Sequence, residues 1–459
     1  MNTDSIFFLG AFLPVALLLY YLLPGQRLKN ALLLLLSLIF YAFGSLQGLI
    51  VLLISAGVNF LLSRYARRKW VLILGIVWNL LLLGGYKYWS VLLPGSITQN
   101  SFFAGLLPPL GISFFTFKAI SYLIDIYRKQ PEKNSTFFAF LLYLSFFPQA
   151  TAGPITRFSD FQPQLTDRSH AWENTAKGIR RFVVGLGKKL LLAGTLATLV
   201  DGVFALAPGD VDARLAWLAA LGYMLQIYFD FSGYSDMAIG LAQMFGFTTQ
   251  ENFCYPYIAN TIGDFWRRWH ISLSSWFKDY LYIPLGGNRK GKVRAGINKL
   301  IVFVLCGIWH GSAVTFLLWG LWHGVLSALE SWNVIPAKKL QKLPVIGHLY
   351  TLLAVCLGFV IFRAGSVEQG FQMLGAMFGD FSVTAAGSVA FYRLFNLQAL
   401  AVLLLGVLFC LPWNIWLRKN QTLARISDIL SYPAVIVLFA VCLLQLASGS
   451  FAPFIYAQF

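Results

Sequence analysis

The chain has 459 residues, of which 58% are hydrophobic and only 12% are charged. Long apolar runs recur from end to end, which excludes a soluble domain and predicts a polytopic helical membrane protein. The formal net charge is +17. Its basic residues lie in short loops between the apolar runs, as the positive-inside rule requires, so nucleic-acid binding is disfavoured. The five cysteines lack metal-ligand spacing and predict neither a disulfide framework nor a metal site.

Basic loops give an orientation to the first part of the chain. Apolar runs at 6–23, 46–63 and 107–126 are each followed by Lys and Arg residues. The runs at 31–43 and 70–85 are the crossings in the opposite direction. Because positively charged loops stay on the cytoplasmic side, these loops are predicted inside. The N-terminus is then predicted outside.

Two segments do not fit a full crossing of the membrane. The run 135–152 ends in a Pro- and Gly-containing stretch and has basic residues on both sides, so it is predicted to be re-entrant. The segment 234–250 is predicted to be a second re-entrant or interfacial piece.

Seven later runs complete the membrane domain, and the basic stretch 255–299 between them is predicted inside. These runs are 182–206, 215–232, 298–313, 315–332, 345–363, 397–416 and 429–448. We expect eleven or twelve transmembrane helices in one domain that covers 1–459. No internal repeat is visible, which weakens the interpretation as a transporter built on inverted halves.

Two histidines are the first candidates for chemistry. His270 follows the basic, aromatic segment Phe265–Trp269, and His310 lies in the apolar run 298–313. Ionisable groups within a membrane are costly to bury and are therefore functional candidates by default. His310 is expected near the middle of its run, about halfway through the bilayer.

Short motifs extend over nearly the whole chain. They are Pro109–Phe117, Ser121–Asp125, Phe146–Gln149, Ala152–Ile155, Asp230–Asp236, Trp266–His270, Ile308–Gly311, Phe362–Ala364 and Pro453–Tyr456. Each motif is weak alone. In combination they resemble the membrane-bound O-acyltransferase superfamily, and most closely its bacterial branch of alginate O-acetyltransferase membrane subunits.

The resemblance implies a ring of tilted helices in which a funnel or tunnel from one face nearly meets a cavity from the other. It also implies a catalytic core at about 107–363, with His310 as the catalytic histidine and His270 as a second functional histidine. The chemistry agrees, because a neutral imidazole can remove a hydroxyl proton when an acyl group leaves a thioester. The alternative for each histidine is a structural role.

The basic residues near His270 have two interpretations. They are Arg267, Arg268, Lys278, Arg289 and Lys290. We expect them to form an entrance that binds the phosphates of coenzyme A. A segment rich in Arg and Trp at the cytosolic face is also typical of an anchor to anionic membrane lipid, and both roles can hold together.

Two residues near His310 also have alternatives. Cys306 precedes His310 by four residues, so one helix face presents both, but an intramembrane cysteine more often fills space than acts as a nucleophile. His323 belongs to a second Trp-His-Gly sequence. We expect a hydrogen-bonded structural histidine there, with the role of catalytic base as the alternative.

Two pairs of charged residues complete the candidates. Lys118 and Asp125 are seven residues apart on one predicted helix and are expected to form a structural pair, with a catalytic role as the alternative. Asp230 and Asp236 lie in a Gly- and Ser-containing break, where they either line a cavity or bind local backbone.

The resemblance implies an acetyltransferase in the bacterial cytoplasmic membrane. Its donor would be cytosolic acetyl-CoA, with no metal. The acetyl group would reach an extracytoplasmic polysaccharide such as alginate or peptidoglycan through a separate esterase-like partner of the SGNH type. A transporter or flippase that moves an acyl or polysaccharide intermediate without chemistry is the alternative.

Overall fold

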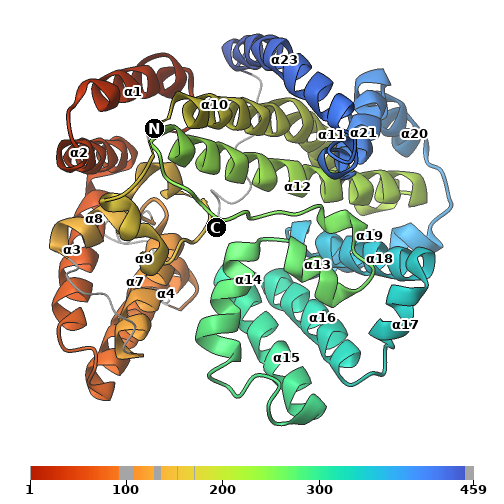
Figure 1. The fold of residues 1–459 in the computed structure, drawn as a ribbon. Helices are drawn as coiled ribbons and strands as arrows, with labels where there is room; N and C mark the ends of the chain where they lie inside the picture. The colour runs from red at the N-terminus through yellow and green to blue at the C-terminus, as the bar shows by residue number, and fades with distance from the viewer. Residues whose placement is uncertain (1, 93–107, 129–135, 152, 170, 450–459) are drawn as a thin grey trace. The chain divides into compact units, whose positions relative to one another are not determined.

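The computed structural model describes residues 2–92, 108–128, 136–151, 153–169 and 171–449, and within these ranges every regular element is a helix (Figure 1). The predicted all-helical fold class is confirmed. Contacts divide the chain into two compact units, Met1–Val184 with Tyr234–Glu251 and Gly185–Gly233 with Asn252–Phe459. The prediction of one domain over 1–459, with a catalytic core at about 107–363, stays a prediction. The motif Pro453–Tyr456 lies outside the described residues.

The first unit contains α1 (Leu13–Leu22), α2 (Gln26–Gly44), α3 (Leu46–Ser63), α4 (Lys69–Leu92), α7 (Ile112–Tyr127), α8 (Phe137–Ser145) and α9 (Phe158–Phe161). Both units share α10 (Trp172–Gly187) and α12 (Ala213–Met244). The second unit contains α11 (Gly194–Phe204), α13 (Ile262–Arg268), α14 (Ile271–Phe277), α15 (Gly291–His310), α16 (Val314–Ser331), α17 (Ala337–Lys342), α18 (Pro344–Arg363), α19 (Val367–Gly379), α20 (Ala385–Leu394), α21 (Leu397–Phe409), α22 (Trp413–Leu417) and α23 (Gln421–Ala447).

Seven helices in the described ranges are long and apolar enough to cross a membrane, and the bent pair α20 and α21 makes eight if it is one span. The membrane class is confirmed, but the expected eleven or twelve such helices are not found. Some predicted runs form shorter helices: α7 has 16 residues, a rise of about 24 Å against a hydrocarbon core of about 30 Å. The predicted run 215–232 lies within α12, a longer helix that also contains Arg214, Asp230 and Asp236.

The two predicted re-entrant segments have different outcomes. The first contains only the nine-residue α8 and the short 3-10 turn Phe147–Gln149. Nine residues rise about 14 Å, too little to cross a membrane, as the prediction requires. The second prediction is wrong, because α12 continues through this segment to Met244. Gly240 within the segment allows close packing and does not break the helix: a Cβ at this position would lie 2.6 Å from the carbonyl oxygen of Gly178.

The acidic residues within α12 form ion pairs. Asp230 Oδ1 accepts from Lys189 Nζ at 3.0 Å, and both side chains are buried. Asp236 Oδ1 accepts from the Arg181 guanidinium at 2.9 Å. They therefore lie in a regular helix with cationic partners, and the predicted Gly/Ser break around them is wrong.

Polar groups inside the first unit find partners on neighbouring helices. Asn59 in α3 and Asn79 in α4 are fully buried and exchange two amide hydrogen bonds, at 3.2 and 2.6 Å. This exchange satisfies both amides where no water can. The Lys118 ammonium group donates to the Tyr143 carbonyl oxygen at 3.1 Å. The predicted pair of Lys118 with Asp125 is not formed.

In the second unit, α15 and α16 lie side by side (Figure 1), and glycines allow their close approach. A Cβ at Gly307 would lie 2.5 Å from the Phe316 carbonyl oxygen, and one at Gly320 would lie 2.5 Å from that of Phe303. Small residues at a helix crossing permit backbone contact that larger ones prevent. The contact fixes the end of α15 against α16. The indole of Trp322 in turn ties α16 to α18 by donating to the Ala354 carbonyl oxygen at 2.8 Å.

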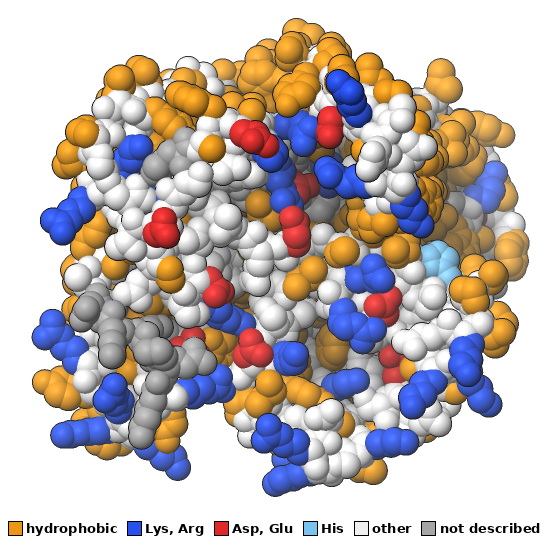
Figure 2. All heavy atoms as spheres, viewed as in Figure 1, with side chains coloured by type: hydrophobic (Ala, Val, Ile, Leu, Met, Phe, Trp, Pro, Cys, Tyr) orange, Lys and Arg blue, Asp and Glu red, His pale blue; other side chains and the backbone are white. Residues whose placement is uncertain are grey.

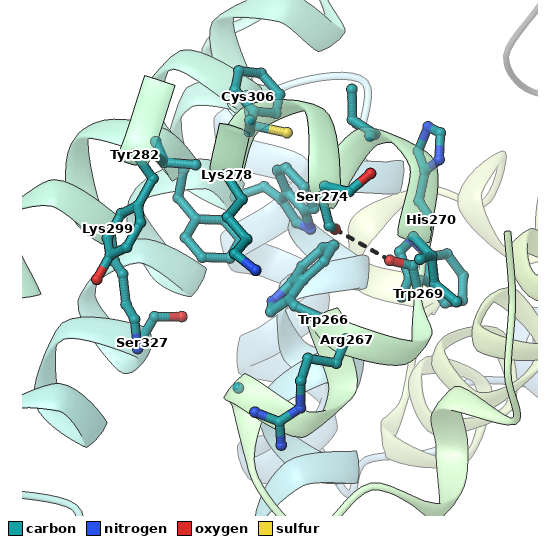
Figure 3. Close-up of a pocket in the computed structure, with 18 of the residues that line it drawn as sticks. Trp266, Arg267, Trp269, His270, Ser274, Lys278, Tyr282, Lys299, Cys306 and Ser327 are labelled. Atoms are coloured by element: carbon teal, nitrogen blue, oxygen red, sulfur yellow. Dashed lines mark hydrogen bonds between the residues drawn. The ribbon is translucent and has the colours of Figure 1, made fainter. Parts of the chain in front are cut away.

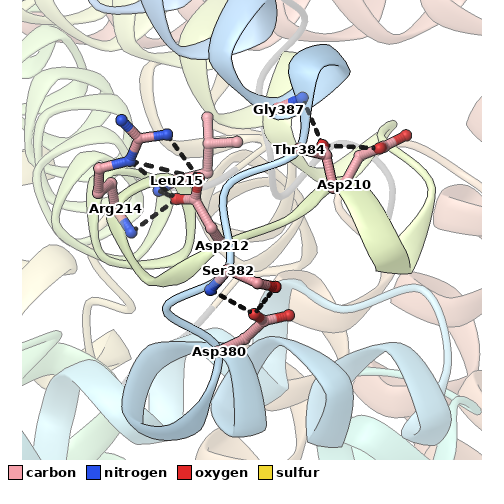
Figure 4. Close-up of polar contacts among 8 residues, drawn as sticks. All are labelled: Asp210, Asp212, Arg214, Leu215, Asp380, Ser382, Thr384 and Gly387. Atoms are coloured by element: carbon pink, nitrogen blue, oxygen red, sulfur yellow. Dashed lines mark hydrogen bonds and ion pairs between the residues drawn. The ribbon is translucent and has the colours of Figure 1, made fainter.

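Carboxylates organise the loops before α12 and α20 in the same unit (Figure 4). Asp212 Oδ1 accepts from the backbone N–H of Arg214 at 2.9 Å, next to the start of α12. The Thr384 hydroxyl donates to Asp210 Oδ1 at 3.0 Å and accepts from the backbone N–H of Gly387 in the first turn of α20. One side chain thus caps α20 and connects it to the loop before α12.

The surface of the second unit has apolar and basic regions. α23 exposes apolar side chains such as Ile429 and Ile436, and Figure 2 shows this apolar surface at the upper right, where Figure 1 places α21 and α23. Lys292 and Arg294 are exposed at the start of α15. Lys and Arg side chains gather at the lower edge of Figure 2, where Figure 1 places this helix.

The α15–α16 contact gives a stability prediction. Gly320→Ala places a methyl group against the Phe303 carbonyl oxygen, so overpacking should destabilise the protein by roughly 1–3 kcal/mol. Thermal unfolding in detergent measures the effect. Gly375→Ala is the matched control, because nothing lies within 4 Å of its added Cβ. Equal melting temperatures for the two variants would show that the close contact is absent.

Candidate active site

The second unit contains an open cavity of about 410 Å³ between α13, α14, α15, α16 and α18 (Figure 3). Both His270 and His310 line it, so the structure brings together two histidines that are forty residues apart in the sequence. We call it the histidine cavity. Most of its lining is aromatic and aliphatic, with cations and hydroxyl groups among the remaining side chains.

The orientation of His270 is set by an uncommon backbone conformation and by a hydrogen bond with the Asn252 side-chain amide. It lies between α13 and α14 with φ at 44°, in the left-handed region that few non-glycine residues adopt. Its Nδ1 lies 3.1 Å from Asn252 Oδ1, and its ring packs edge-to-face on Phe231 at 4.6 Å between centroids. The side chain is 2% exposed. These contacts fix the orientation of the ring.

The same contacts fix the tautomer of His270. Asn252 Oδ1 also accepts from the backbone N–H of Ser272 at 3.1 Å, so this amide atom is the oxygen. The Nδ1 that faces it must carry the proton, which leaves a lone pair on Nε2. Nε2 has no hydrogen-bond partner in the described part of the chain. Burial lowers the pKa of His270 to about 3, so the ring is neutral at physiological pH.

His310 is the last residue of α15 and is 3% exposed. The predicted position near the middle of an apolar run is wrong, because α15 begins at Gly291 and includes basic residues that we expected in a loop. Its imidazole packs edge-to-face against Trp319 and Phe362, with centroids 5.1 and 5.2 Å apart. The end of α15 thus places this imidazole in the lining of the histidine cavity.

Three cations line the histidine cavity: Arg267, Lys278 and Lys299, which we call the cation triad (Figure 3). Arg267 pairs with Asp264 at 3.1 Å, but its side chain is 65% exposed, so the pair contributes little. Lys278 and Lys299 form no ion pair within the described residues. No carboxylate lies among the described lining side chains. The charged side chains that line the cavity are therefore all cationic, and Glu330, outside the lining, interacts electrostatically with Lys299 and Arg267.

The other three predicted cations do not line the cavity. Arg268 donates to Asp264 Oδ2 at 2.9 Å and to the Cys254 carbonyl oxygen at 3.2 Å. Arg289 and Lys290 are exposed in the turn before α15. Their predicted role in phosphate binding stays a prediction, and so does an interaction with lipid.

His323 and Cys306 occupy different positions relative to the cavity. Cys306 lines it, one helical turn before His310. His323 does not line it and is fully buried, with its ring 5.0 Å from that of Trp266. Neither ring nitrogen of His323 has a hydrogen-bond partner in the described ranges, so the expected hydrogen-bonded histidine is not found.

The sequence interpretation missed three residues of the site. Lys299 was assigned to a basic loop, and Trp319 to an apolar run. Both line the cavity. Asn252, which orients His270, follows α12 and has no motif of its own. Its only sequence signal is its position, eighteen residues before His270, in a polar stretch between apolar segments.

Comparisons with known proteins show the family of the chain. The model of the membrane-bound O-acyltransferase family matches residues 128–332, which include both histidines and the cation triad. A probable alginate O-acetylase of Pseudomonas syringae pv. tomato is 42% identical over 84% of this chain and 77% of its own length. A probable alginate O-acetylase of Pseudomonas putida is 36% identical over the full length of both chains. A peptidoglycan O-acetyltransferase of Helicobacter pylori is 36% identical over 81% of this chain and 79% of its own.

The chain therefore belongs to the membrane-bound O-acyltransferase family. It is a multi-pass membrane protein and an O-acyltransferase enzyme. The resemblance seen in the sequence motifs is confirmed.

The neutral state of His270 gives a pH prediction. Its pKa is about 3 in the fold and about 6.5 when unfolded, so below pH 6.5 the unfolded chain binds the extra proton and stability falls. Between pH 7 and pH 5 this group alone should remove roughly 2 kcal/mol, at about 1.4 kcal/mol for each pKa unit. Thermal unfolding of wild type and His270→Gln measures it. The variant should lose less stability on acidification; equal losses would contradict a neutral, buried His270.

Proposed function

We propose that this protein transfers acetyl groups from cytosolic acetyl-CoA to a hydroxyl acceptor. The observation that carries this proposal is the single cavity that holds both histidines and the cation triad. A thioester donor with phosphates needs cations at one end and a base at the other, and the cavity offers both.

In this proposal the cation triad binds the phosphates of coenzyme A. Lys278 and Lys299 form no ion pair in the described part of the chain, so a phosphate would give these ammonium groups a charged partner. Ser274 and Tyr282, which line the same cavity, supply hydroxyl groups for further hydrogen bonds. Phosphate binding at this end would place the thioester towards the histidines.

His310 is proposed as the general base. The acceptor hydroxyl gives its proton to the imidazole while its oxygen attacks the thioester carbonyl carbon. The carbon–sulfur bond then breaks, and the coenzyme A thiolate takes up the proton. His270 is proposed as the second functional histidine, because its Nε2 lone pair accepts a hydrogen bond from an N–H or O–H group of the substrate.

The final acceptor is proposed to be an extracytoplasmic polysaccharide, since the relatives are named for alginate and for peptidoglycan. The protein would lie in the bacterial cytoplasmic membrane. We propose that a separate esterase-like partner of the SGNH type receives the acetyl group outside and places it on the polymer.

Loss of the proposed base gives the first functional prediction. His310→Gln keeps the size and hydrogen bonding of the side chain but cannot take up a proton, so activity should fall by about a hundredfold to ten-thousandfold. Purified protein in detergent, incubated with radiolabelled acetyl-CoA, measures thioester cleavage and acetyl transfer. His323→Gln is the matched control and should stay active. An active His310→Gln together with an inactive His323→Gln would move the base to His323; two active variants would contradict base catalysis by either.

The cation triad gives the second functional prediction. Removing the charge of Lys299 with Lys299→Gln should raise the KM for acetyl-CoA by about tenfold to a hundredfold, since a hydrogen bond to a charged group contributes roughly 1.5–3 kcal/mol. The maximal rate should change little, because the phosphates are bound equally before and during the reaction. Arg289→Gln, outside the cavity, is the matched control. An unchanged KM for Lys299→Gln would remove this lysine from the donor site.

A further inference from the structure

Trp319 combines a position in the site with an unused hydrogen-bond donor. It belongs to α16, is 2% exposed and lines the histidine cavity. Its indole Nε1–H has no acceptor in the described part of the chain. Indole nitrogen can only donate, and a buried donor without an acceptor costs about 1–3 kcal/mol. An acceptor atom supplied by a ligand would remove this cost.

The position of Trp319 relative to His310 indicates which ligand atom accepts this hydrogen bond. The two rings are in edge-to-face contact, with centroids 5.1 Å apart and planes at 88°. A group that His310 touches is therefore also within reach of Trp319. The Trp319 ring is held from other sides by Trp266 at 5.6 Å and by Phe362 at 5.2 Å, so its orientation is fixed before any ligand binds.

We propose that the Trp319 indole N–H is a catalytic hydrogen-bond donor to the carbonyl oxygen of the acyl group. The proposal rests on the proposed function. As the acceptor oxygen bonds to the carbonyl carbon and its proton passes to His310, the C=O π pair moves onto the carbonyl oxygen. Trp319 stabilises this oxyanion. When the carbon–sulfur bond breaks, the C=O bond re-forms and the thiolate takes the proton from His310.

The energetics favour this assignment over simple substrate binding. A donor that is fixed in place and excluded from water stabilises charge at low reorganisation cost, and charge grows on this oxygen only in the transition state. Loss of such a donor therefore lowers kcat and leaves KM nearly unchanged. A purely structural tryptophan would instead change stability, or kcat and KM together.

Trp322 offers a matched control on the same helix. Its indole N–H already donates to the Ala354 carbonyl oxygen at 2.8 Å, and it does not line the cavity. Trp319→Phe and Trp322→Phe remove the same chemical group from neighbouring turns of α16. Only the first removes a donor from the site.

The test measures acetyl-CoA cleavage and transfer by the full-length protein in detergent. Trp319→Phe should lower kcat by about a hundredfold to a thousandfold with KM within about threefold of wild type. Trp322→Phe should keep kcat near wild type. A kcat for Trp319→Phe close to wild type, or equal losses in both variants, overturns the proposal.

An isostere removes the donor without changing packing. Benzothienylalanine incorporated at position 319 replaces the indole N–H by sulfur and keeps the shape of the ring. This variant provides the test if Trp319→Phe does not fold. A loss of kcat supports the donor role, and retained kcat overturns it. Failure of the Trp319 proposal can be distinguished from failure of the proposed function. An inactive wild type, or an active His310→Gln, contradicts the proposed function. An active wild type with an inactive His310→Gln and a fully active isostere contradicts only the role of Trp319.

Discussion

The cost of an unpaired polar group in apolar surroundings is the constraint on which this structure depends. A buried donor, acceptor or charge must find a partner inside the protein, because the hydrocarbon supplies none. The Asn59–Asn79 exchange and the Lys189–Asp230 pair satisfy this requirement between helices. Among the side chains that line the histidine cavity, His270 Nε2 and the indole N–H of Trp319 have no partner within the described residues, and in the proposed mechanism the substrate supplies it.

Backbone contact between α15 and α16 sets the geometry of the site. Gly307 and Gly320 bring the two helices together, so His310 at the end of α15 meets Trp319 on α16. The aromatic rings around them leave little freedom to either side chain. In the proposed mechanism, a base and a hydrogen-bond donor whose rings are already packed in place meet the condition for electrostatic catalysis, which is that the polar groups are oriented before the reaction.

The sequence predicted the helical membrane class and the family. The class depends on composition and on apolar runs, and the family depends on short motifs of consecutive residues; both can be read from a single sequence. It also identified His270 and His310, since ionisable residues among aromatic and apolar neighbours are conspicuous. It could not show that Lys299 lines the cavity, because a lysine in a basic stretch is equally well explained by membrane orientation. The tryptophan at position 319 was missed for a similar reason: in an apolar run, nothing distinguishes a donor in a cavity from a residue that faces lipid.

The errors have one physical origin. The Gly and Ser residues around Asp230 suggested a break, but Gly233 permits close packing of a continuous α12. The basic residues before His310 suggested a loop, but they form the first turns of α15, which places His310 at a helix end. In both cases a local preference was overridden by contacts between helices, which a single sequence does not display.

The central claim is that one cavity binds the phosphates at the cation triad and the acyl carbonyl between His310 and Trp319. The most direct measurement is a cryo-electron microscopy structure of the protein with an acetyl-CoA analogue in which a methylene group replaces the thioester sulfur. The account predicts density for the diphosphate at Lys278 and Lys299, with the ketone oxygen within hydrogen-bond distance of Trp319 Nε1. Density for the analogue elsewhere, with the histidine cavity empty, would contradict it.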